Sequence, residues 1–117
     1  MTETAVQPQR TLSPEIATFC RLAVEALRAK LPVREVWLFG SQAEGKADRH
    51  SDYDFLVVLA DEHGLRRPNL ESYSAIREIS DLESVDAVAI SEGKWRREQA
   101  DPWGFFGEIA LKGVRVG

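Results

Sequence analysis

The sequence is poor in the features that build disulfide frameworks, zinc sites and membrane spans. Cys20 is the only cysteine among 117 residues, so the chain alone builds neither a disulfide nor a four-ligand zinc site. No stretch approaches the roughly 20 apolar residues that cross a bilayer. The first eleven residues are polar and lack the apolar core of a signal peptide. These absences predict a cytoplasmic protein without a membrane segment.

An excess of positive charge is also missing. The formal net charge is -4, which gives no basic field to hold the backbone of a long nucleic acid. With 44% hydrophobic and 29% charged residues, the composition is that of an ordinary globular protein. A chain of 117 residues has room for one domain around one core. We expect residues 1–12 to be a flexible lead-in and residues 13–117 to form this single domain.

Local patterns predict helices that alternate with short strands. Ser13-Pro14-Glu15 is a typical helix start, and apolar residues then recur at helical spacing until Pro32. A second helix is predicted over residues 70–82, with an apolar stripe of Leu70, Tyr73, Ile76, Ile79 and Leu82.

Strands are predicted over residues 33–39, 53–60 and 84–90, and a closing helix is predicted to end at Gly113, before a short apolar run. This order favours a two-layer α/β (α+β) domain, with a mixed sheet of about four strands and helices mainly on one face.

Two short motifs lie where the predicted strands begin or end. Gly40-Ser41 follows the first strand, and Asp52-x-Asp54 begins the second. Because alternate residues of a strand point to the same face, Asp52 and Asp54 present two carboxylates on one side of the sheet. Asp86 lies among apolar residues of the third strand, where an acid is costly unless it is paired or binds a metal. If the second and third strands are neighbours, the three carboxylates converge.

Three converging carboxylates favour Mg²⁺, which prefers hard oxygen ligands and completes its coordination with substrate phosphates. Two such ions about 3.5 to 4 Å apart can hold the attacking and leaving oxygens of an in-line displacement at phosphorus. In this arrangement Asp52 and Asp54 bridge both ions. Asp86 binds the ion that activates the incoming hydroxyl, and it is expected to accept the hydroxyl proton.

The turn before these acids is suited to phosphate. Gly40 lets the backbone approach a ligand closely, and Ser41 offers a hydroxyl and an N–H at the start of a helix, where the dipole favours anions. We expect both residues to hold the β and γ phosphates of a nucleoside triphosphate. Lys46 and Arg49, in the following loop, are candidates to neutralise the leaving pyrophosphate.

Together these residues resemble the signature of the nucleotidyltransferase superfamily that includes the polymerase β type, and particularly its minimal branch. The resemblance rests on residues 38–46 and 51–58, and it extends to Asp86 and to the end at residues 113–116. It implies a polymerase-β-like nucleotidyltransferase core that transfers a nucleoside monophosphate, with AMP from ATP as the expected reaction. This chain has Glu44 where the family more often has a basic residue. It therefore stays open whether Lys46 or Arg49 neutralises the leaving pyrophosphate.

Small free-standing members of the minimal branch are commonly antitoxins, paired with a HEPN-domain toxin whose tyrosine they adenylylate. The resemblance therefore implies a HEPN-domain toxin as the partner protein, supplied in trans. An alternative stays open from the sequence: a binding protein that neutralises its partner by contact alone and keeps the acids as a nucleotide-sensing or vestigial site.

Two other interpretations of the motifs are less well supported. Residues 40–47 differ from a Walker A loop at the last position, where Ala47 has no hydroxyl for Mg²⁺. Asp52 and Asp54 taken alone are also typical of a turn in which acids cap backbone N–H groups. That interpretation accounts for neither Gly40-Ser41 nor Asp86.

Several remaining residues are given no catalytic role. His50 and His63 lie in polar loops without other ligands nearby in sequence, so they are expected at the surface. Cys20 falls on the apolar stripe of the first helix and is expected to be a small buried residue. The tail aromatics are equally consistent with a core and with a docking face: Trp95, Trp103, Phe105 and Phe106.

Overall fold

The structure is a computed structural model that describes residues 12–45, 52–80 and 83–117. The predicted lead-in, residues 1–12, therefore lies outside the described residues except for Leu12. The described elements are, in chain order, α1 (Pro14–Lys30), β1 (Val33–Phe39), α2 (Ser41–Glu44), β2 (Tyr53–Leu59), α3 (Pro68–Arg77), β3 (Val85–Ser91), α4 (Glu92–Glu98), α5 (Phe105–Lys112) and β4 (Val114–Arg115).

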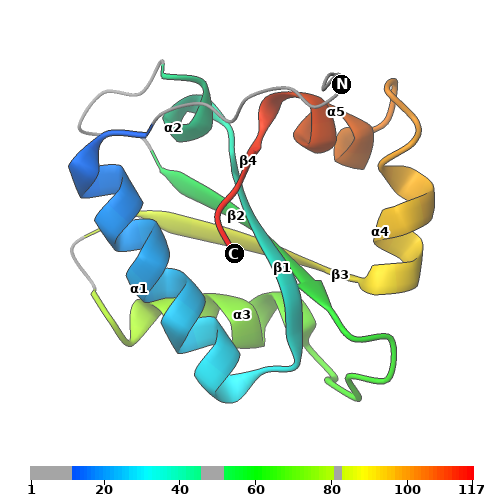
Figure 1. Cartoon of the computed structure of the whole chain (residues 1–117). Coiled ribbons are helices and arrows are strands. Elements are labelled where there is room, and N and C mark those ends of the chain that lie inside the picture. The colour runs from blue at the N-terminus through cyan, green and yellow to red at the C-terminus, as the bar shows by residue number, and fades with distance from the viewer. Residues whose placement is uncertain (1–11, 46–51, 81–82) are drawn as a thin grey trace, which may run out of the picture.

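The strands form one mixed sheet in the order β3-β2-β1-β4 (Figure 1). β1 runs antiparallel to β2 and to β4, whereas β2 and β3 are parallel. A parallel pair needs a crossover connection, and α3 supplies it between β2 and β3. The mixed four-stranded sheet was predicted correctly, and the bounds of its three longer strands differ from the predicted ones by at most one residue.

The sheet separates two apolar clusters. On one face, α1 and α3 pack over the cluster that includes Phe55 and Val57. On the other face, α4 and α5 pack over Leu56 and Val58 (Figure 1). The two longer helices share one face as predicted, and the shorter α4 and α5 add a smaller cover on the opposite face. Residues 55–59 of β2 have no exposed surface, so this strand is the centre of the fold.

The first helix begins as its sequence predicts. The Ser13 hydroxyl accepts a hydrogen bond from the Ile16 N–H at 3.3 Å, and Pro14 occupies the first helical position. Cys20 is 2% exposed on the buried face of α1, which confirms the expected small buried residue. The helix thereby lays an apolar stripe across one face of the sheet.

The α3 helix differs from the prediction in length and in its buried face. It spans Pro68–Arg77, whereas residues 70–82 were predicted. Leu70 and Tyr73, expected to face the core, are 50% and 36% exposed. The buried side chains are Ser72, Ala75 and Ile76, of which only Ile76 was predicted. Small residues at 72 and 75 suit the approach of α3 to both α1 and β3, so packing overrode the hydrophobic pattern.

The tail forms two short helices where one closing helix was predicted. Gly113 ends α5 as expected, and its N–H donates to the Ile109 carbonyl at 2.7 Å. The aromatic residues divide between core and surface: Trp95 is 1% exposed, whereas Trp103 is 95% and Phe105 53% exposed. Among the described residues, no helix is long and apolar enough to cross a membrane.

The two tail tryptophans provide a matched test of this packing. Trp95 contacts the Trp37 and Phe106 rings with centroid distances of 5.5 and 6.4 Å. Trp95→Ala is expected to lower the free energy of unfolding by about 3 to 5 kcal/mol, because it removes a buried aromatic side chain. Trp103→Ala is expected to change it by less than about 0.5 kcal/mol. Urea unfolding measures both values, and equal losses would contradict the packing of the tail.

Candidate functional site

The three predicted acids come together at one end of the sheet. In the parallel pair of β2 and β3, Asp54 lies directly opposite Asp86. Asp52 precedes β2 by one residue and shares the face of Asp54. One carboxylate oxygen from each residue lies within 4.8 Å of those of the other two. The predicted adjacency of the second and third strands is therefore confirmed.

The acids lie on the face opposite α1 and α3. Tyr53 and Phe55, their alternating neighbours, point into the cluster under α1. Asp54 is partly buried, whereas Asp52 and Asp86 are exposed. The expectation that Asp86 is an acid in an apolar environment was wrong, because β3 is an edge strand and the carboxylate faces solvent. Its proximity to Asp54 is what links Asp86 to the site.

The negative charge of Asp54 is destabilised by this arrangement. Burial raises the pKa of its carboxyl group, and the negative charges of Asp86 and Asp52 raise it further. Crowded carboxylates of this kind favour either a proton or a bound cation. Hard oxygen donors at this spacing suit a divalent ion such as Mg²⁺.

Gly40, in the turn after β1, lies against the Asp54 carboxylate. Its φ of +77° is in the left-handed region, which favours glycine. A Cβ atom at this position would overlap the Asp54 carboxylate, so only glycine permits the observed approach. The Gly40 carbonyl accepts hydrogen bonds from the Ala43 and Glu44 N–H groups, which start α2. Ser41 is the first residue of that helix and directly follows Gly40.

Not all of the predicted site residues can be placed. Lys46, Arg49 and His50 lie outside the described residues. The Nδ1 atom of His63 accepts a hydrogen bond from the Leu65 N–H at 2.9 Å, which indicates a role in its loop. Burial raises the pKa of Cys20 to about 12, so this thiol is not an activated nucleophile.

A small cavity beside Gly40 was not predicted from the sequence. It has a volume of about 140 Å³, and its lining joins the end of β1 to α2 and α5. The lining residues are Phe39, Gly40, Glu44, Phe105, Glu108, Ile109 and Lys112. Phe105, Glu108, Ile109 and Lys112 recur at helical spacing, which is the only sequence signal that they share a face.

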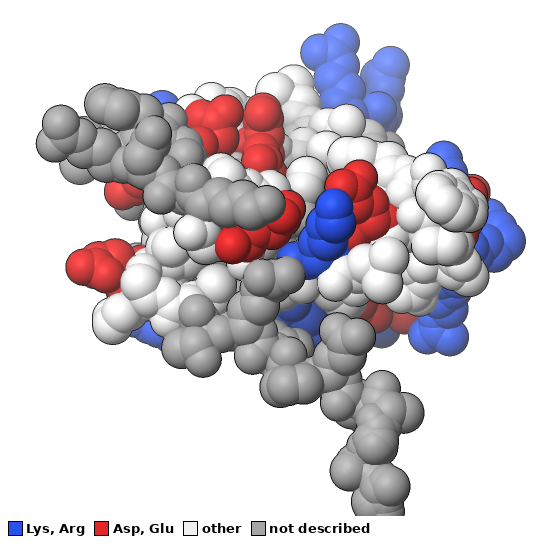
Figure 2. Space-filling view, turned by 90° about the horizontal axis from the view of Figure 1, so that it is seen from above, with Lys and Arg blue, Asp and Glu red and all other residues white. Residues whose placement is uncertain are grey.

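Acidic groups gather on this end of the molecule. Figure 2, which views the protein from the top of Figure 1, shows red Asp and Glu side chains across the middle of the face. Most blue Lys and Arg side chains lie toward its margin. The local field therefore favours cations over free anions.

Comparison with known proteins places this arrangement in context. The model of a family described as nucleotidyltransferase domain matches residues 20–101, which contain the Gly40 turn and all three acids. A candidate nucleotidyltransferase from Sulfolobus solfataricus, known from a crystal structure, is 26% identical, with a TM-score of 0.51. The match covers 71% of this chain and 73% of that one.

A second crystal structure, of a toxin-antitoxin with AMP-PNP, contains a chain that is 20% identical, with a TM-score of 0.59. The match covers 84% of this chain and 72% of that one, and at this identity the likeness concerns the fold alone. A search of the curated proteins finds no significant match.

The charge crowding at Asp54 predicts a stability effect. A raised pKa means that the folded protein binds this proton more tightly than the unfolded chain does, so stability is lost as the pH rises from about 4 through the folded pKa. In metal-free buffer at pH 7, Asp54→Asn is expected to raise the free energy of unfolding, and the gain is expected to shrink toward pH 4. Urea unfolding at several pH values measures it.

The same variant tests cation binding. Mg²⁺ or Mn²⁺ is expected to raise the melting temperature of the unchanged protein and to have little effect on Asp54→Asn. Glu62→Gln, which removes an exposed carboxylate after β2, serves as the matched control. Equal stabilisation of all three proteins by the ion would contradict a metal centre at these acids.

Proposed function

This chain belongs to the nucleotidyltransferase domain family, and on that premise we propose that it transfers AMP from ATP to a hydroxyl group of a partner protein. The observation that carries the proposal is the convergence of Asp52, Asp54 and Asp86 beside the Gly40 turn. A metal-binding acid cluster and a phosphate-binding turn are the two parts that such a reaction needs on the nucleotide side.

The donor set fits Mg²⁺. Asp52 and Asp54 would hold both ions, and Asp86 would help to hold one of them, because each residue offers an oxygen to the same small volume. When bound, Mg²⁺ neutralises the charge that develops on the phosphate oxygens during the transfer. Relief of the repulsion around Asp54 contributes to the affinity for the ion.

The residues of the chain have distinct tasks in this reaction. Gly40 and Ser41 hold the β and γ phosphates, so that the α-phosphorus lies at the acids. Asp86, exposed on the edge strand, accepts the proton of the attacking hydroxyl. A bond forms between that oxygen and the α-phosphorus, while the bond to the pyrophosphate oxygen breaks. Lys46 and Arg49 are proposed to neutralise the pyrophosphate as it leaves.

We further propose that the acceptor is a tyrosine of a HEPN-domain toxin and that the chain acts as its antitoxin. Two observations support a protein partner. The fold is similar to that of a chain in a toxin-antitoxin structure with AMP-PNP. Trp103 leaves 95% of its surface exposed, so a large aromatic side chain is available for contact with a partner.

A labelling experiment tests this function. The chain is incubated with the product of the neighbouring gene and with ATP labelled at the α phosphate, and the partner is then analysed by mass spectrometry. We expect AMP on a tyrosine of the partner, together with loss of its toxicity. Asp52→Ala with Asp54→Ala is expected to abolish both, whereas Glu62→Gln is expected to retain both.

The outcomes separate catalysis from binding. If the double variant labels and neutralises the partner as well as the unchanged protein does, metal-dependent transfer at these acids is wrong. If the partner is neutralised without ever being labelled, the chain acts by contact alone.

Asp86 has a narrower expected effect. Asp86→Asn is expected to lower the transfer rate by about 10²- to 10⁴-fold, because the attacking hydroxyl loses its proton acceptor. Binding of ATP is expected to persist, since Asp52 and Asp54 remain. Single-turnover rates and calorimetric titration with ATP measure the two effects, and parallel loss of rate and binding would contradict the role given to Asp86.

A further inference from the structure

The cavity between α2 and α5 adjoins the acid site through one residue. Gly40 lines this cavity, and its α-carbon also approaches the Asp54 carboxylate closely. A ligand whose phosphates lie over Gly40 can therefore place its remaining part at the mouth of the cavity. The volume of about 140 Å³ is sufficient for one flat heteroaromatic ring system and too small for a folded protein segment.

The walls of the cavity suit a flat ring. Phe39, Phe105 and Ile109 supply its apolar surface. Phe105 is held by two edge contacts, at 5.7 Å to Phe39 and 5.1 Å to Phe106, with interplanar angles of 88° and 74°. About half of the Phe105 side chain nevertheless stays exposed. A fixed aromatic ring with free surface is a stacking platform for a nucleobase.

The polar groups of the cavity oppose phosphate and favour an amino group. Glu44 and Glu108 bring two carboxylates, and Lys112 brings one ammonium group. Carboxylates only accept hydrogen bonds, so they attract the exocyclic amino group of adenine and repel a carbonyl oxygen at the same place. The Lys112 ammonium, 3.2 Å from the Glu108 carboxylate, brings a hydrogen-bond donor to the same wall of the cavity. Both side chains of that pair are more than half exposed, so the pair can open at little cost.

We propose that this cavity binds the nucleobase of the donor nucleotide, with Phe105 as the stacking residue and Glu108 selecting a base that carries an exocyclic amino group. The inference rests on the proposed nucleotidyl transfer and adds the residues that choose the nucleotide. It makes the last described helix, α5, part of the substrate site.

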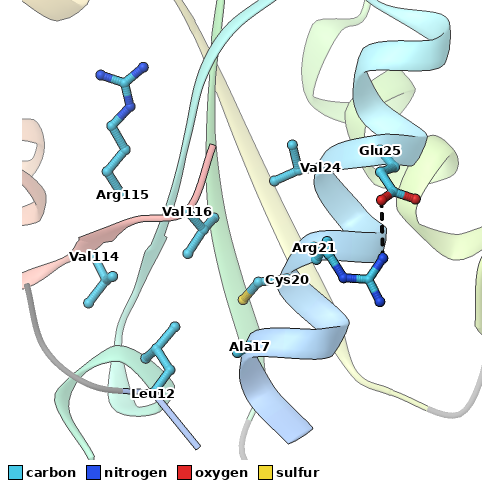
Figure 3. Close-up of a pocket in the computed structure, with 9 residues that line it drawn as sticks. All are labelled: Leu12, Ala17, Cys20, Arg21, Val24, Glu25, Val114, Arg115 and Val116. Atoms are coloured by element: carbon cyan, nitrogen blue, oxygen red, sulfur yellow. Dashed lines mark hydrogen bonds and ion pairs between the residues drawn. The ribbon is translucent and has the colours of Figure 1, made fainter. Parts of the chain in front are cut away.

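A larger cavity does not compete for this role. It has a volume of about 380 Å³ and lies between α1 and β4, where Cys20, Val24 and Val116 are among its apolar lining residues (Figure 3). Its charged groups include Arg21 and Glu25, which pair with each other at 3.1 Å (Figure 3). Cys20 belongs to the cluster on the face of the sheet opposite to Asp54, so a nucleotide there would be remote from the acids.

The test compares nucleotides with inorganic tripolyphosphate, which lacks a base. Calorimetric titrations with the magnesium complexes of ATP, UTP and tripolyphosphate are performed on the full chain. Phe105→Ala is expected to weaken ATP binding on the order of tenfold and to leave tripolyphosphate binding unchanged. The control is Leu111→Ala, since Leu111 is a 61% exposed α5 residue outside the cavity, and it is expected to change neither affinity.

Glu108→Gln provides a second, conservative variant. The unchanged protein is expected to prefer ATP to UTP, and Glu108→Gln is expected to reduce that preference severalfold, because the glutamine amide can donate to a carbonyl oxygen. Tripolyphosphate binding is expected to stay unchanged.

The results distinguish failure of the base site from failure of the proposed function. Unchanged ATP binding in Phe105→Ala, or equal loss of ATP and tripolyphosphate binding, overturns the base site while leaving the proposed transfer reaction intact. Equal binding of ATP and UTP by the unchanged protein overturns the role of Glu108. If the unchanged protein binds no triphosphate with Mg²⁺, the proposed function fails, and the base site fails with it.

Discussion

The parallel pairing of β2 with β3 is the constraint on which the acid site depends. In the observed register Asp54 lies opposite Asp86, and a shift of one residue would turn the third carboxylate toward the face covered by α1 and α3. The crossover helix α3 makes the parallel pairing possible. Asn69, in its first turn, also accepts a hydrogen bond from the Ala89 N–H of β3 at 2.7 Å. The α3 helix, between the two strands that carry Asp54 and Asp86, therefore helps to hold these strands in register.

A rigid apolar layer lies behind the acids. On the opposite face of β2, the Tyr53 ring stacks on Phe55 and packs against Phe19 at a centroid distance of 4.5 Å. Residues 55–59 are fully buried, so β2 cannot move away from its neighbours without exposing much of the core. This packing opposes the mutual repulsion of the carboxylates. The fold thus supports a charge cluster that lowers its own stability, as functional sites commonly do.

Local signals in the sequence were sufficient for most of the sheet. The apolar run of β2 and the start of α1 could be predicted because short-range patterns determine them, and alternation alone placed Asp52 and Asp54 on one face. The position of Asp86 depended on strand order, which arises from long-range packing. The buried face of α3 was misplaced because contacts with α1 and β3 select small residues, such as Ser72, over Leu70. The nearness of α5 to Gly40 had no sequence signal beyond helical spacing, so Phe105 and Lys112 were missed.

The contact between Gly40 and the Asp54 carboxylate also has a thermodynamic consequence. The Gly40 turn, which we propose to hold the phosphates, lies against the Asp54 carboxylate, which we propose to hold the cation, so a shift of one affects the other. Any ion that reorients the carboxylate changes the geometry available to the phosphates, and the reverse holds equally. By linkage, each ligand must then change the affinity for the other by the same factor. In the proposed reaction, the absence of a Cβ atom at Gly40 thus links the binding of the phosphates to the binding of the cation.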